Sequence, residues 1–98
     1  MIHEIHRVTG VEQVADFTLK LGFGDGTSQT IDFSPVLVGN IYGPLADPGL
    51  FRQVRLDPES HTIVWPNGAD FDPAQLHDWP SVRDAFVRLA RSWAASPV

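Results

Sequence analysis

Residues 17–33 read FTLKLGFGDGTSQTIDF, and this stretch decides the fold. In its first half every second residue is apolar, which is typical of a strand with one buried face; these residues are Phe17, Leu19, Leu21 and Phe23. Gly24-Asp25-Gly26 follows, and glycine accepts the positive φ angles that a tight hairpin turn needs. Residues 27–33 then return with Ile31 and Phe33 on one face. The sequence therefore predicts an antiparallel hairpin at the centre of the fold.

Turn and capping residues divide the rest of the chain into short elements. We expect a strand over 2–8, a helical turn or apolar loop over 34–39, and a second hairpin from 54–57 and 61–65. Asp47-Pro48 and Asp72-Pro73 each place a capping residue before proline, which predicts two short helices. Trp79-Pro80 interrupts the second of these, and residues 81–95 form the clearest helix. The predicted fold class is α+β, an antiparallel meander of about four to five short strands with short helices and a C-terminal amphipathic helix.

Length and composition limit the class of protein. The chain has 98 residues, of which 43% are hydrophobic, so we expect a single domain, with a strand-rich body over 1–79 and a C-terminal helix over 80–98. It contains no cysteine, which excludes disulfides, thiolate catalysis and cysteine-based zinc sites. The N-terminus lacks the pattern of a signal peptide, and no apolar run approaches the ~20 residues that span a bilayer. We therefore expect a cytoplasmic protein that does not bind membranes.

Charge is distributed unevenly along the chain. The net charge is −5: residues 1–79 hold four basic and eleven acidic groups, and residues 80–98 hold three arginines and one aspartate. Attraction to phosphate dominates non-specific binding to nucleic acids, and the acidic body opposes it. We therefore expect no nucleic-acid partner.

Four segments of the chain together resemble a known family. They are Phe23-x-Asp25-Gly26, Asp32-Phe33-Ser34-Pro35, Pro44-Leu45-x-Asp47-Pro48-x-Leu50-Phe51 and Val64-Trp65-Pro66-Asn67-Gly68-Ala69-Asp70. Over about residues 1–78 the chain is similar to the bacterial domain-of-unknown-function family 2442, and the last segment is the most specific of the four.

This resemblance implies a compact α+β fold and leaves the biochemical activity open. Some members of the family look like partners of a second small protein in toxin–antitoxin-like pairs, and others are fused to a helix-turn-helix domain. Residues 80–98 predict one helix, whereas a helix-turn-helix unit needs several. DNA binding is therefore not carried over to this chain.

The loop containing Trp65, Asn67 and Asp70 is the first candidate site. An exposed tryptophan beside an amide and a carboxylate would form a lip for a ligand or a partner protein. A structural interpretation is favoured by the residue types: Trp65 ends a strand in the core, residues 66–68 make the turn, and Asp70 or Asp72 caps the next helix.

Histidines and carboxylates give no clear site in the sequence. His3 and His6 would fall on opposite faces of the predicted first strand, while His61 and His77 are remote in sequence. No cysteine or His-Glu-x-x-His pattern joins them, so we expect no metal and no cofactor. No spacing of carboxylates indicates convergence on a cleft, and we expect a protein that is not an enzyme and has no catalytic residues.

The C-terminal helix carries the second candidate surface. Its apolar stripe is spaced by four, three and four residues, and consists of Val82, Phe86, Leu89 and Trp93. The stripe packs either on the body of the same chain or on another protein, including a second copy of this chain. We expect a non-enzymatic protein-binding or accessory module, with an antitoxin-like role on the family resemblance. The alternative is a small-ligand sensing or regulatory domain.

Overall fold

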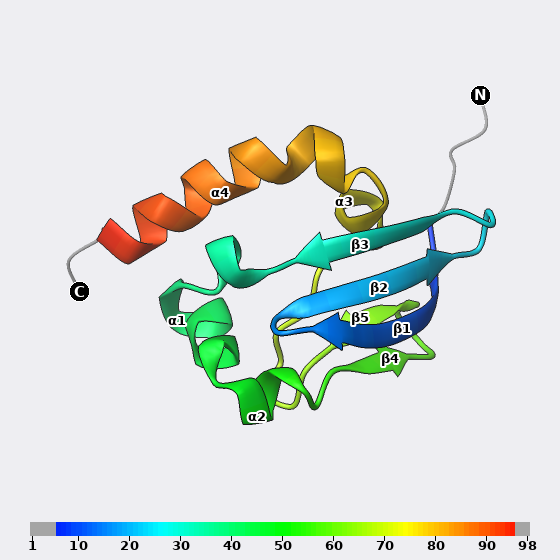
Figure 1. Ribbon diagram of the computed structural model, residues 1–98, viewed down its shortest axis with the longest axis horizontal. Helices are drawn as coiled ribbons and strands as arrows, with labels where there is room; N and C mark the ends of the chain where they lie inside the picture. The colour runs from blue at the N-terminus through cyan, green and yellow to red at the C-terminus, as the bar shows by residue number, and fades with distance from the viewer. Residues whose placement is uncertain (1–5, 96–98) are drawn as a thin grey trace.

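The computed structural model describes residues 6–95, which form two antiparallel sheets, a set of short helices and one long helix (Figure 1). The strands are β1 (Val8–Ala15), β2 (Thr18–Phe23), β3 (Ser28–Asp32), β4 (Arg55–Asp57) and β5 (Thr62–Val64). The α-helices are α1 (Gly39–Tyr42), α2 (Pro48–Phe51), α3 (Pro73–His77) and α4 (Trp79–Ala95), and two 3₁₀ turns are η1 (Ser34–Val36) and η2 (Gly43–Ala46). This arrangement confirms the predicted α+β class, with five strands.

The predicted central hairpin is present as β2 and β3, and β2 is the middle strand of the order β1-β2-β3. Leu19 pairs with Ile31 across the hairpin, and both side chains are buried. Lys20, on the other face of β2, is exposed. The chain reverses direction at the hairpin tip, where Gly26 has a φ of 87°, a conformation that glycine adopts without strain. Alternation therefore predicted the correct buried face.

The structure contains a first strand that the sequence did not predict, and it corrects the position of Phe17. The expected strand over 2–8 falls mainly on residues 1–5, which lie outside the described part of the chain, and β1 begins only at Val8. Beyond Val8 no side chain of β1 is buried, so apolar alternation could not predict this strand. It is defined by its backbone pairing with β2. Phe17 lies in the turn between these strands with a φ of 54°, instead of inside a strand. Its ring packs edge-on against Phe51 at 5.4 Å.

The second hairpin consists of β4 and β5, forms the two-stranded sheet and lies beside β1 of the first sheet (Figure 1). Val8 N donates to the carbonyl of His61 at 2.8 Å. The buried Thr62 hydroxyl donates to the carbonyl of Phe71 at 2.6 Å, which ties β5 to the segment that leads into α3. These two hydrogen bonds therefore join the start of β5 to β1 and to the segment that leads into α3.

Both predicted short helices begin at an aspartate cap. Asp47 Oδ1 accepts from Gly49 N at 3.0 Å at the start of α2, and Asp72 Oδ1 accepts from Ala74 N at 2.9 Å at the start of α3. Each cap satisfies a backbone donor that the first helical turn leaves free. The helices bury Phe51 and Leu76 completely.

Helix α4 begins at Trp79, two residues before the predicted start. Pro80 is tolerated there because a proline in the first turn removes an N–H that has no partner within the helix. The helix runs from α3 past η1 towards α1 and packs on its own body (Figure 1). Over residues 79–93, for which the structure describes the side chains, the buried residues of α4 are Trp79, Val87 and Ala90. Trp79 contacts Phe33 and Phe71 at ring distances of 5.8 and 6.3 Å.

Candidate functional site

The loop after β5 places Trp65 in the core. This side chain is 2% exposed, and its indole N–H donates to the carbonyl of Phe51 at 2.9 Å. An indole is buried at low cost when its N–H finds such a partner. Trp65 is therefore a core residue, and it does not form an exposed lip for a partner.

Asn67 and Asp70 connect the same loop to α1. The Asn67 amide donates to the carbonyl of Ile41 at 3.0 Å, and its oxygen accepts from Ala69 N at 3.1 Å. The Tyr42 hydroxyl donates to the backbone carbonyl of Asp70 at 2.8 Å. Both loop residues are exposed, and these contacts give Asn67 and the Asp70 backbone a structural role.

The stripe on α4 is covered unevenly. Val82, Phe86 and Trp93 are half-buried, whereas Leu89 is 51% exposed. Tyr42 of α1 lies 5.9 Å from the Trp93 ring and 6.2 Å from the Phe86 ring. The body of the protein therefore covers one side of the stripe and leaves Leu89 at its open edge.

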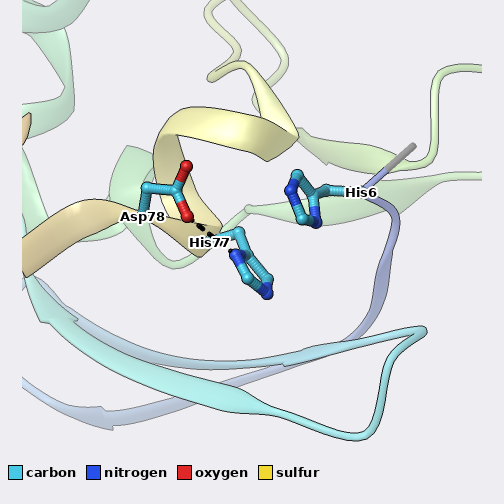
Figure 2. A group of neighbouring side chains, drawn as sticks. All are labelled: His6, His77 and Asp78. Atoms are coloured by element: carbon cyan, nitrogen blue, oxygen red, sulfur yellow. Dashed lines mark hydrogen bonds and ion pairs between the residues drawn. The ribbon is translucent and has the colours of Figure 1, made fainter. Parts of the chain in front are cut away.

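A second group of side chains forms where the β2–β3 hairpin meets the α3–α4 junction. His77, the last residue of α3, places Nε2 at 2.7 Å from Asp25 Oδ2 and Nδ1 at 2.9 Å from Asp78 Oδ1. The ring of His6, which precedes β1, stacks on the His77 ring at 3.9 Å with an interplanar angle of 18°. Figure 2 shows His6, His77 and Asp78 gathered at this junction.

Each carboxylate of this group changes the ionisation of His77. The hydrogen bond to Asp78, followed by that to Asp25, raises the pKa of His77 above its ordinary value. The hydroxyl and the backbone N–H of Thr27, followed by His77, hold the pKa of Asp25 well below its usual range. Both ring nitrogens face carboxylates, and this arrangement favours the imidazolium form of His77.

Sequence reasoning missed this group because its members are far apart in the chain. His6 and His77 lie near the two ends of the segment 6–79. The sequence pattern around Asp25 predicted only a turn. Asp25 does serve the turn, since its Oδ1 accepts from Thr27 N at 3.0 Å, while its Oδ2 faces His77. His3 lies outside the described residues. The spacing along the chain contained no feature that could reveal this convergence.

The chemistry open to the group follows from its donor atoms. Ligand atoms of His6, His77 and Asp78 all lie within 4.8 Å of one another. Imidazole nitrogen with a carboxylate oxygen is a donor set suited to borderline divalent metal ions. When His77 is protonated, its ion pairs with Asp25 and Asp78 join the hairpin tip to the α3–α4 junction.

Comparison with known proteins gives one family. A family model described as "Protein of unknown function (DUF2442)" matches residues 8–79, which run from the first residue of β1 to the first residue of α4. Searches of curated proteins and of solved structures gave no match. Within residues 6–95, none of the helices has the length and apolar character needed to cross a bilayer.

Proposed function

The chain belongs to the DUF2442 family of proteins of unknown function, and from this premise we propose that it is a cytoplasmic, non-enzymatic module that binds another protein through α4. The observation that carries the proposal is the half-exposed Leu89, three residues after Phe86 and four before Trp93. Residues at these spacings are neighbours on a helix surface. Leu89 therefore extends a partly covered aromatic surface that a partner can complete.

The charge beside Leu89 indicates the chemistry of that partner. Arg88, the residue before Leu89, is exposed on the same helix, about 100° around its axis. Arg91, two residues after Leu89, is on the opposite side of the helix and does not border this surface. Apolar contact at the centre with charge complementarity at the rim is the usual organisation of such interfaces. We expect a partner with an apolar groove and an acidic rim, as the partner of an amphipathic helix.

Four aspartates give the non-enzymatic part of the proposal its support. Asp32, Asp47, Asp57 and Asp72 each accept a hydrogen bond from the backbone N–H two residues later. These carboxylates serve turns and helix caps. A general acid–base pair instead needs carboxyl groups that converge on a substrate cleft.

A matched pair of variants tests the proposed surface. Leu89→Glu places a charge at the open edge of α4, and Val14→Glu places the same charge at a similarly exposed valine of β1, which is 48% exposed. Each variant is co-expressed with the product of the adjacent gene and examined by gel filtration with light scattering. We expect Leu89→Glu to abolish the complex and Val14→Glu to retain it.

Other outcomes of this experiment decide between partners. If no complex forms with the neighbouring protein, or if the chain gives no protection from a growth arrest that this protein causes, the antitoxin-like role is rejected. A dimer of the chain alone that Leu89→Glu dissociates would identify a second copy as the partner. Equal loss in both variants would place the interface elsewhere.

Small-ligand sensing is the second candidate, and the group around His77 is the observation that favours it. Its two imidazoles and two carboxylates come from the segment before β1, the hairpin tip and the α3–α4 junction. A ligand bound there would couple these segments. A thermal-shift screen of metabolites and metal ions tests it, and a flat response across the panel would reject it.

A further inference from the structure

Asp25 holds His77 in the way that a carboxylate holds a metal-binding histidine. Its Oδ2 lies 2.7 Å from Nε2 of His77. The carboxylate itself is fixed through Oδ1, which accepts from Thr27 N at 3.0 Å and from Thr27 Oγ1 at 2.6 Å. In metal sites a ligating histidine commonly donates its other ring N–H to a carboxylate, which fixes the tautomer and the ring orientation. Nδ1, beside Asp78, is then the nitrogen left for a metal.

The hairpin also fixes the backbone and the ring of His77. Gln29 of β3 donates from Nε2 to the carbonyl of His77 at 2.8 Å. The ring of Phe23 in β2 lies 5.1 Å from the imidazole in an edge-to-face arrangement. A site supported by paired strands is held more precisely than one built on a loop.

We propose that His6, His77 and Asp78 bind one Zn²⁺-like divalent cation, with Asp25 as the residue that positions His77. Two nitrogen donors and one oxygen donor suit zinc and its neighbours, whereas Ca²⁺ and Mg²⁺ take oxygen ligands. With neutral imidazoles, the charges of Asp78 and Asp25 balance a divalent ion. Three protein ligands leave one tetrahedral position for water or a further ligand.

Metal binding requires the ligand atoms of His6, His77 and Asp78 to move closer together. Bonds of about 2.0–2.2 Å place tetrahedral donor atoms roughly 3.3 Å apart. The donor atoms lie within 4.8 Å of one another, so each pair must approach by no more than roughly 1.5 Å. The His6 ring is stacked nearly parallel to His77, and it must turn out of the stack for its lone pair to face the same point. A ligating histidine is neutral, so the metal binds the form of His77 whose Nδ1 carries no proton.

The test is a zinc titration of the tag-free, chelator-treated chain at neutral pH by isothermal titration calorimetry. We expect one ion per chain with a Kd of about 10 µM or tighter. His6→Gln and His77→Gln are expected to weaken binding by about 100-fold, and Asp25→Asn by roughly 10–100-fold because it acts through His77. Cobalt substitution gives a second readout, since its visible absorption reports a tetrahedral site that Asp25→Asn distorts.

His61→Asn is the matched control. His61 is exposed in the β4–β5 turn with a φ of 57°, a conformation that asparagine also accepts. This variant is expected to bind zinc as the unmodified chain does. Binding weaker than about 1 mM, or equal losses in His61→Asn and His77→Gln, would overturn the proposal. Circular dichroism of each metal-free variant shows whether a loss comes from unfolding.

The proposed metal site is independent of the partner surface on α4. Leu89→Glu changes no residue of the histidine group, so it is expected to keep full zinc affinity. Loss of the protein complex with intact zinc binding would contradict only the interface, and the reverse result would contradict only the metal site.

Discussion

Aspartate is the residue that organises this chain locally. Five of them accept from the backbone N–H two residues later, and they are Asp25, Asp32, Asp47, Asp57 and Asp72. Short polar side chains of this kind mimic a backbone turn or cap a helix. Much of the negative charge of the chain therefore has a structural origin. Asp25 alone among these five also reaches a histidine far along the chain.

Thr62 provides the first test at the residue scale. Its side chain is 3% exposed, and its hydroxyl donates to the carbonyl of Phe71 at 2.6 Å. Thr62→Val keeps the shape and removes the donor, which leaves that carbonyl without this partner, so we expect a loss of about 1–3 kcal/mol in the free energy of unfolding. Urea denaturation measures it. Thr62→Ser keeps the donor and is expected to lose less; if serine loses as much as valine, the hydrogen bond is not the cause.

Asp57 provides a test of pH dependence. The hydroxyl of Ser60, followed by the N–H of Glu59, holds the pKa of Asp57 below its ordinary value. A carboxylate whose folded pKa is lowered stabilises the fold above its unfolded pKa of about 3.9, and this contribution is lost as the pH falls through the folded pKa. The stability difference between the unmodified chain and Asp57→Asn should therefore shrink from pH 6 towards strongly acidic pH. A difference that stays constant in urea titrations would contradict this account.

Elements that depend on residues close together in the sequence could be predicted. Elements that depend on pairing with another part of the chain could not. The β2–β3 hairpin and both aspartate caps depend on residues within a few positions of each other, and all three are present. β1 depends on pairing with β2 and carries little buried surface, so no apolar pattern in the sequence predicted a strand over Val8–Ala15. The loop at Trp65 was correctly interpreted as a turn that follows a core residue.

Gly39 tests the contact between α1 and α4. It has a φ of 85°, and a Cβ there would lie 3.4 Å from Cβ of Trp93. Gly39→Ala places a side chain on a left-handed backbone and in contact with Trp93, and we expect a loss of about 1–2 kcal/mol in the free energy of unfolding. Gly49→Ala in α2 is the control, because its φ is not positive and its Cβ meets Asp47 only at 3.6 Å. Equal effects of the two substitutions in thermal melts would show that the close approach to α4 is unimportant.

For the whole molecule, one apolar cluster includes residues from β1 through α4. The family match ends at residue 79, yet Val87 and Ala90 of α4 are buried in that cluster. The helix is therefore part of the body as well as the proposed docking surface. The site around His77 is also a property of the whole molecule, because it needs the hairpin, the helix junction and the segment before β1 in place.

Removal of α4 tests this integration. A chain that ends at residue 78 loses Trp79, Val87 and Ala90 from the core and uncovers Phe71. Truncation of a single large buried side chain already costs about 3–5 kcal/mol, a large fraction of the stability of a small domain. We expect the shortened chain to lack a cooperative thermal transition and dispersed NMR signals. A sharp transition near that of the full chain would show that the body folds without its helix.

The aromatic packing has an optical consequence. Phe33 lies 6.3 Å from Trp65 and 5.8 Å from Trp79, while Phe86 lies 5.6 Å from Trp79 and 5.9 Å from Trp93. Trp65 and Trp79 are shielded from water, and Trp93 is half-exposed on α4. The intrinsic emission of the chain thus contains two buried fluorophores and one at the surface that a partner would cover. Docking on α4 can be followed as a blue shift of that one indole, without any label, and Trp93→Phe should remove the change.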